Sequence, residues 1–162
     1  ITGDVFAADA APVPHQMRNY GGQAMNRIYE TSDGEYIVLA GSEAKFCENL
    51  LRALGRLDFL NLAKDEPGPA QQPLIDFFTE IFRAKTRSEW EAFLTPLDLC
   101  WAPVRTLKDG FSDANSTARA IRLKDGEGNP HIGPAIKFTH EPAEPRFALP
   151  TYGESETGWK PR

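Results

Sequence analysis

The backbone groups best suited to bind a ligand lie at Gly21-Gly22-Gln23. Two consecutive glycines carry no side chain, so their N–H groups can approach an anion closely. The same freedom lets such a loop open and close over a site. These three residues are therefore the candidate binding site. The alternative is an ordinary loop that leads into a hairpin.

No pattern in the sequence indicates catalysis. General acid–base catalysis needs two carboxylates, or a carboxylate and a histidine, that converge on one point, and the acidic residues are scattered through expected helices and turns. The sequence has no Gly-x-Ser-x-Gly motif and no Walker-type or dinucleotide-binding glycine motif. We therefore predict no catalytic residue. We also predict no metal site, because the histidines and cysteines lack ligand spacing: His15, His131, His140, Cys47 and Cys100.

A hairpin is expected to position the glycine loop. The runs Met25–Thr31 and Tyr36–Ala40 are typical of β-strands and flank Asp33-Gly34. Asp-Gly between two such runs is a strong hairpin signal, since a type I′ turn needs positive φ at both central residues. We expect a type I′ turn here.

Helices are expected to follow the hairpin. Ser42 is placed to cap a helix over 43–54, and Gly55 to end it. A second helix starts at Pro73 and carries an apolar stripe. A third starts between Thr86 and Ser88, where two capping-box patterns overlap. The remaining predicted elements are an edge strand in 100–106, a helix from Asp113 to Ile121, and a second hairpin of 121–123 with 135–138.

These elements predict an α+β fold, in which short antiparallel hairpins are flanked by several helices and an extended proline-rich tail follows. Residues 1–19 are interpreted as a linker, and 20–124 as a small α+β domain. Residues 125–162 are interpreted as an extended C-terminal segment. That segment is expected to pack on a larger domain or a partner chain, because its apolar residues have little core of their own.

Composition narrows the choice of partners. A net charge of −5 argues against a nucleic acid as the main partner, which needs a basic face. No apolar run approaches the roughly 18 residues that would span a membrane. Two distant cysteines suit buried free thiols in a reducing compartment, so a cytoplasmic location is expected.

Several motifs occur in the same order as in the family III CoA-transferases, and the sequence resembles that family. The family includes formyl-CoA transferases, carnitine CoA-transferase-type enzymes and α-methylacyl-CoA racemases. The likeness covers about Tyr20 to Glu154 and matches only the later part of such an enzyme. The motifs are Gly21-Gly22, Tyr29-x-Thr31-x-Asp33-Gly34-x-Tyr36, the helix from Glu43-x-Lys45-Phe46 to Ala53-Leu54-Gly55-Arg56, Glu89-Trp90, Cys100-Trp-Ala-Pro103-Val104, Ala118-Arg119 and Pro150-x-x-Gly153-Glu154.

The resemblance implies the small lid and interface domain of an enzyme that moves coenzyme A between a carboxylic acid and an acyl-CoA thioester. It implies a CoA thioester as substrate, no permanently bound cofactor, and an interlocked homodimer. Gly21, Gly22 and Gln23 match the family's glycine-rich loop, which folds over the active site. This loop has fewer glycines than the fuller version, which leaves a racemase-like branch open.

The family's catalytic residues belong to the larger preceding domain. Transferases use an aspartate nucleophile, and racemases use a histidine and an aspartate. No residue of this sequence matches them, so the chain alone is expected to be inactive. A second hypothesis is a stand-alone binding or interaction module that serves no enzyme.

Overall fold

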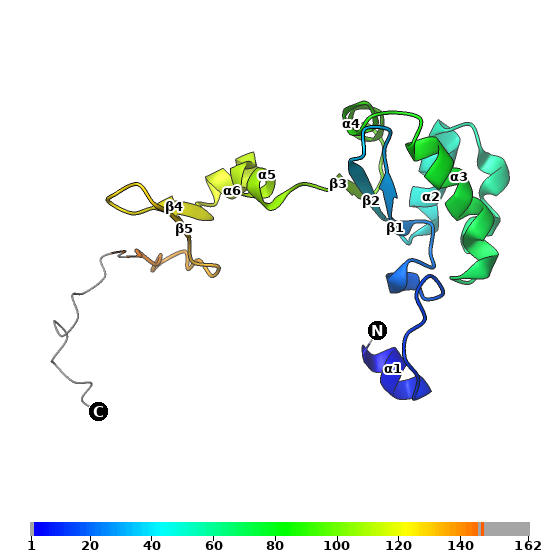
Figure 1. Cartoon of the computed structure of the whole chain (residues 1–162), viewed down its shortest axis with the longest axis horizontal. Helices are drawn as coiled ribbons and strands as arrows, with labels where there is room; N and C mark the ends of the chain where they lie inside the picture. The colour runs from blue at the N-terminus through cyan, green and yellow to red at the C-terminus, as the bar shows by residue number, and fades with distance from the viewer. Residues whose placement is uncertain (1, 146, 148–162) are drawn as a thin grey trace. The chain divides into compact units, whose positions relative to one another are not determined.

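The computed structural model describes residues 2–145 and 147 of the chain. They form two compact units, unit 1 (Ile1–Val104) and unit 2 (Arg105–Arg162), and each is described by itself (Figure 1). The expected domain boundary after residue 124 stays a prediction. Unit 1 contains α1 (Thr2–Ala8), η1 (Arg18–Tyr20), β1 (Asn26–Glu30), β2 (Tyr36–Ala40), α2 (Ala44–Ala53), η2 (Leu57–Phe59), η3 (Leu62–Lys64), η4 (Pro69–Gln71), α3 (Gln72–Phe82), α4 (Arg87–Leu94) and β3 (Trp101–Pro103).

The predicted hairpin forms the centre of a three-stranded antiparallel sheet in the order β1-β2-β3. Its turn is not of the expected type I′, because Gly34 has φ +74° whereas Asp33 does not have positive φ. Thr31 N–H donates to Glu35 O at 2.8 Å, and Gly34 N–H donates to Thr31 O at 3.1 Å. The loop therefore has three residues and ends in a left-handed glycine, an arrangement that needs only one residue with positive φ.

The helix after β2 ends as predicted but begins differently. Ser42 does not cap it; the N-cap residue is Glu43, and no side chain bonds to the first turn. At the other end, Gly55 takes φ +69°. Its N–H donates to Arg52 O and that of Arg56 to Leu51 O. This pair of hydrogen bonds is a Schellman motif, which satisfies the last carbonyls of α2.

The next two helices follow their sequence signals. The apolar stripe of α3 faces the core through Leu74, Phe78 and Phe82. Of the two overlapping capping boxes, the structure forms the one at Thr86: its side chain accepts from Glu89 N–H, and the Glu89 carboxylate accepts from Thr86 N–H. The reciprocal bonds satisfy two backbone donors and so fix where α4 begins.

One face of the sheet packs on the helices, and its core is aromatic. Figure 1 shows α2 and α3 on one side of β1 and β2. Tyr29 stacks on Phe82 at 5.1 Å between ring centroids and meets the edge of Phe78 at 5.8 Å. Phe82 contacts Trp90, whose indole N–H donates to Phe82 O at 2.8 Å. Offset and edge-on ring contacts add to the burial of these large side chains, which locks β1, α3 and α4 together.

The opposite face of the sheet carries an apolar row. The register places Ile28 beside Val38, and Val38 beside Ala102. Ile28 is 55% exposed. In an antiparallel sheet with one solvated face, the outward residues are usually polar. No element among the described residues of unit 1 covers this row, so it is a surface suited to contact.

Unit 2 contains a pair of short helices and a two-stranded sheet. Its elements are α5 (Leu107–Ser112), α6 (Ala114–Ala118), β4 (Arg122–Lys124) and β5 (Pro130–Ile132). The predicted cap at Asp113 is confirmed, since its side chain accepts from Asn115 N–H at 2.8 Å. Helix α5 was not predicted; the Thr106 side chain caps it by accepting from Asp109 N–H.

The second hairpin forms with a different partner strand. β4 pairs with β5, Leu123 opposite His131, and not with residues 135–138. Asp125 explains the difference, because its carboxylate accepts from the N–H groups of Glu127 and Asn129 at 2.9 and 2.8 Å. The chain therefore reverses within a short loop, and the residues immediately after it complete the sheet.

Together the two units confirm the predicted α+β fold with small antiparallel sheets. Residues 133–145 contain no helix or strand, as expected of the proline-rich tail. The rest of the tail, apart from residue 147, lies outside the described residues.

Candidate functional site

The glycine turn is shaped by close contacts between backbone segments. Gly21 ends η1 with φ +85°, a conformation that other residues rarely adopt. A Cβ at Gly22 would lie 2.7 Å from the carbonyl carbon of Gln16 and 2.9 Å from Met17 O. Only a residue without a side chain fits there. Both glycines are thus required by the local fold.

The backbone groups of the glycine turn form hydrogen bonds with other residues of unit 1. Gly22 N–H donates to Met17 O at 2.9 Å, and Gly22 O accepts from Gly68 N–H at 2.8 Å. The guanidinium of Arg27 donates to Gly21 O. In this structure, therefore, Gly22 N–H is not available to an anion. This differs from the sequence-based picture of glycine amides that face a ligand.

Gln23 is the predicted site residue whose side chain offers a donor to a ligand. Gln23 is 7% exposed, and its Oε1 accepts from the Ser42 hydroxyl at 3.4 Å. Ser42 was expected to cap α2, and it instead contacts the candidate site. Gln23 Nε2 contacts no acceptor among the described residues. Its amide N–H₂ can therefore donate to a ligand that reaches it.

A second glutamine, which sequence reasoning missed, anchors the chain just after the turn. Gln71 is 1% exposed. Its Oε1 accepts from Ala24 N–H at 3.0 Å, and its Nε2 donates to Asp65 O at 2.7 Å. Tyr29 OH donates to Ala24 O at 2.8 Å, and burial raises the pKa of that hydroxyl. Both backbone groups of Ala24 are thus fixed. No local signal points to Gln71, which is 47 residues away in the sequence.

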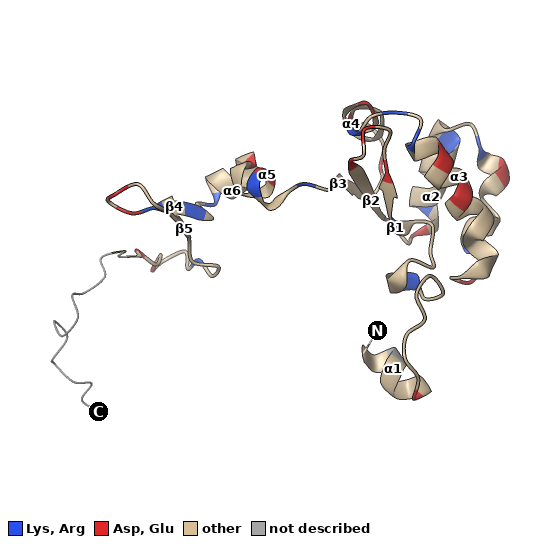
Figure 2. Cartoon of the chain, in the orientation of Figure 1, with Lys and Arg blue, Asp and Glu red and all other residues tan. Residues whose placement is uncertain are grey.

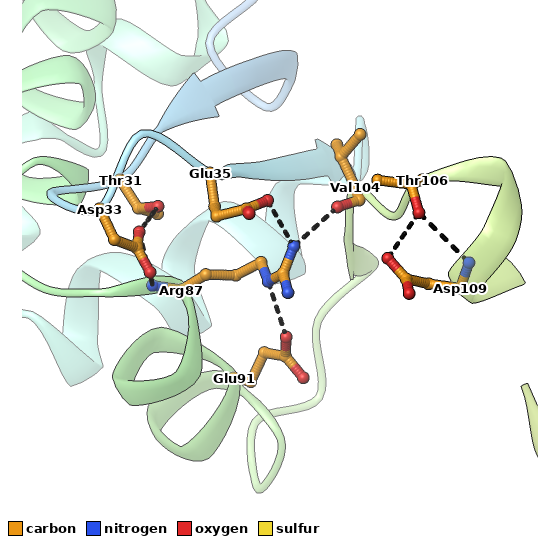
Figure 3. A network of polar contacts seen from close by, with 8 residues as sticks. All are labelled: Thr31, Asp33, Glu35, Arg87, Glu91, Val104, Thr106 and Asp109. Atoms are coloured by element: carbon orange, nitrogen blue, oxygen red, sulfur yellow. Dashed lines mark hydrogen bonds and ion pairs between the residues drawn. The ribbon is translucent and has the colours of Figure 1, made fainter.

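A network around Arg87 holds the far end of the same sheet (Figure 3). Its guanidinium pairs with Glu35 at 2.6 Å and with Glu91 at 3.3 Å, and donates to Val104 O at 3.2 Å. Asp33 accepts from Arg87 N–H at 3.2 Å. Figure 3 shows these groups converging from the hairpin turn, α4 and the end of β3. The network is therefore structural.

Asp33 is also bonded within its own turn. The Thr31 hydroxyl donates to its carboxylate. This hydrogen bond, with help from Arg87 N–H, lowers the pKa of Asp33.

Unit 2 brings together a carboxylate and a histidine that no sequence pattern predicted to pair. His131 Nε2 lies 3.0 Å from Asp125 Oδ2. The His131 ring stacks on Phe147 at 4.3 Å between centroids. The hydrogen bond from His131, with those from Asn129, lowers the pKa of Asp125. Because Asp125 also closes the hairpin loop, we interpret the pair as part of that loop.

The described residues contain no cluster of three or more metal-ligating side chains. Within the same part of the chain, every helix is too short or too polar to cross a bilayer.

Known proteins resemble this chain over most of its length. A family model, CoA-transferase family III, matches residues 3–156. α-Methylacyl-CoA racemase of Mus musculus is 30% identical over 141 residues, which is 83% of this chain and 35% of the racemase. The Homo sapiens racemase is 27% identical over 133 residues, 78% of this chain and 33% of the racemase. The chain thus spans about a third of the length of these curated relatives.

The fold has relatives among solved structures. A CAIB/BAIF family protein from Brucella suis aligns with a TM-score of 0.64 at 22% identity, over 87% of this chain and 38% of that protein. At this identity the similarity establishes the fold.

Proposed function

Because the chain belongs to CoA-transferase family III, we propose that it forms the small lid and interface part of an enzyme that moves coenzyme A between a carboxylic acid and an acyl-CoA thioester. The family match over residues 3–156 carries this proposal. The substrates are an acyl-CoA and a carboxylic acid, and no cofactor is permanently bound. The site of action is cytoplasmic.

The proposed contact with the thioester is the glycine turn, Gly21, Gly22 and Gln23. Gln23 Nε2 is the donor that the described residues leave without an acceptor. An amide N–H₂ can stabilise the negative charge that develops on a thioester carbonyl oxygen during acyl transfer. The glycines and Gln71 hold Gln23 in place. When the lid closes over the active site, we therefore expect the whole of unit 1 to move rather than the glycine turn alone.

The proposed interface comprises the outer face of the sheet and the C-terminal segment. The row Ile28, Val38 and Ala102 offers apolar area on this face, which suits contact with a larger domain. Residues 125–162 are proposed to pack on that domain or on a partner chain, in an interlocked homodimer. The catalytic nucleophile is proposed to lie in the larger domain, so that the chain alone is inactive.

A racemase is the second candidate, and a specific observation favours it. The curated relatives from mouse and human are both named α-methylacyl-CoA racemase. A racemase removes and returns the proton next to the thioester carbonyl. The proposed role of Gln23 is compatible with both reactions, because each develops negative charge on the same carbonyl oxygen.

One pair of assays on the product of the whole gene separates these functions. Incubation of a 2-methylacyl-CoA with a second carboxylic acid, followed by mass spectrometry, shows a new CoA thioester if the enzyme is a transferase. Incubation of the same acyl-CoA in deuterium oxide shows a deuterated α-carbon, without a new thioester, if it is a racemase. If neither product forms across a panel of acyl-CoAs, the enzyme proposal fails and the stand-alone binding module replaces it.

The role of Gln23 is tested in the active assay. We expect Gln23→Ala to lower kcat by about 100-fold, as loss of one donor to a developing oxyanion does. Gln72→Ala is the matched control, since Gln72 is an exposed glutamine that bonds to Asp76 on the same helix. Equal activities of the two variants would exclude Gln23 from the site.

A further inference from the structure

Unit 2 contains a pocket to which the proposed function assigns no ligand. It lies between α5 and the β4–β5 hairpin and has a volume of about 290 Å³. Its residues come from three segments of unit 2, and most of its wall is apolar. The lining residues are Lys108, Phe111, Ile121, Arg122, Pro130, His131 and Ile132.

Two cations at the pocket form no ion pair with any of the described residues. Lys108 and Arg122 are exposed, and neither side chain forms an ion pair or hydrogen bond with a described residue. Figure 2 shows basic positions on both α5 and β4. The acidic side chains nearby have other contacts: Asp109 binds the Thr106 hydroxyl, and Asp125 binds His131. An anion that enters the pocket would therefore meet unpaired positive charge.

The wall of the pocket is already ordered. Asp125 Oδ2 holds the His131 ring by a hydrogen bond of 3.0 Å. The ring stacks on Phe147 with an angle of 19° between the planes. Across the hairpin, Arg122 lies directly opposite Ile132 in the strand register. A ligand would find this wall in place, which lowers the entropic cost of binding.

The apolar part of the lining indicates the rest of the ligand. Phe111, Ile121 and Ile132 offer hydrocarbon surface beside the two cations, and Ile132 is 76% exposed. Pockets of this kind bind molecules that are mostly apolar and carry a few polar groups. Arg122 can hold a carboxylate or a phosphate with two parallel hydrogen bonds, and Lys108 supplies a point charge.

We propose that this pocket binds small organic anions, namely a carboxylate or a phosphate carried on an aromatic or short branched apolar body. The inference is independent of the proposed reaction, because it rests on side chains of unit 2 alone. Carboxylate and phosphate share the recognition chemistry, and the experiment below distinguishes them.

The test is an amide NMR titration of the full isotope-labelled chain with phenylacetate and, separately, with phenyl phosphate. We expect saturable shifts at amides of α5, β4 and β5 with at least one of the two anions. Saturation with one anion alone supports the proposal and identifies the preferred head group. Phenethyl alcohol, which is neutral and of similar shape, is expected to bind about tenfold more weakly because it lacks the charge.

Variants locate the binding. Lys108→Gln and Arg122→Gln should each weaken binding by about tenfold, as the loss of one charge-assisted hydrogen bond does. Lys64→Gln is the control, because Lys64 is an exposed lysine of η3 in unit 1. Ile132→Ser should weaken the binding of phenyl phosphate, whose ring contacts the apolar wall, but leave the weak binding of inorganic phosphate unchanged. Shifts elsewhere in the spectrum report whether each variant is folded.

Three outcomes would overturn the proposal. The first is shifts that never saturate, or that centre on unit 1. The second is a Lys108→Gln, Arg122→Gln double variant that binds like the wild type. The third is equal binding of phenethyl alcohol, which would show an apolar pocket with no preference for anions. None of these outcomes affects the acyl-CoA assays, which measure a different reaction.

Discussion

Gln71 and Ala24 are joined by a buried hydrogen bond that spans 47 residues of sequence, with 3.0 Å between Gln71 Oε1 and Ala24 N. This bond connects the start of α3 to the residue that follows the glycine turn. It places Gln23 at the edge of the core, where its Oε1 contacts Ser42 and its Nε2 contacts no acceptor among the described residues. The geometry of the candidate site thus depends on a residue outside it.

Replacing Gln71 should destabilise unit 1. Gln71→Leu leaves Ala24 N–H buried without an acceptor and removes the donor to Asp65 O, so we expect the free energy of unfolding to fall by about 2 kcal/mol. Urea denaturation followed by circular dichroism measures the change. Gln72→Leu, one residue along and exposed, is the control with little effect. Equal losses of unfolding free energy in the two variants would show that the hydrogen bond from Ala24 N–H to Gln71 contributes nothing to stability.

Gly22 should not accept even one methyl group. A Cβ there would lie 2.7 Å from backbone carbon of Gln16, and backbone atoms cannot move aside as a side chain does. We expect Gly22→Ala to lower the free energy of unfolding by about 2 kcal/mol, as overpacking does. Gly3→Ala is the control: nothing lies within 4 Å of its Cβ position, and alanine suits a helix better than glycine. A tolerated Gly22→Ala would contradict the close approach.

The acidity of Asp33 should depend on Thr31. Thr31→Val removes the hydroxyl that donates to the Asp33 carboxylate, so the pKa of Asp33 should rise toward its usual value of about 3.9. Carbon-detected NMR titration measures it directly. Asp58 is the internal control, because its pKa is lowered by Arg56, which the substitution does not touch. An unchanged pKa of Asp33 would assign its acidity to Arg87 N–H instead.

The sign of the effect on stability follows from the lowered pKa. Asp33 binds its proton less tightly in the folded protein than in the unfolded chain. Its contribution to stability is therefore present above the unfolded pKa of about 3.9, and it is lost as the pH falls through the folded pKa. In Thr31→Val this acid-dependent loss should be smaller.

The two thiols should differ in reactivity. Cys47 is 2% exposed, and burial raises its pKa to about 12, so little thiolate forms at neutral pH. Cys100 was expected to be buried as well, but it is exposed. Iodoacetamide should therefore modify Cys100 alone in the folded protein and both thiols in denaturant, as judged by mass spectrometry. Rapid modification of Cys47 in a folded Cys100→Ser variant would contradict its burial.

The sequence by itself determined those elements whose signals and partners are close together. Asp33-Gly34 between two strand-like runs located the hairpin, Thr86 and Glu89 located the start of α4, and Gly55 located the end of α2. In each case the groups that exchange hydrogen bonds lie within a few residues. The apolar stripe of α3 was equally readable, because a helix repeats its buried face at a fixed spacing.

Only the tertiary structure decided where several side chains found partners. Ser42 has the residue type of a helix cap but contacts Gln23, from a different segment. Asp125 shortened the second hairpin by binding two backbone N–H groups, which no strand pattern revealed. Gln71 carried no signal at all, since nothing near it in sequence shows that Ala24 N–H lacks an acceptor. A buried polar group must be paired, and the fold, which brings distant segments together, determines which partner is available.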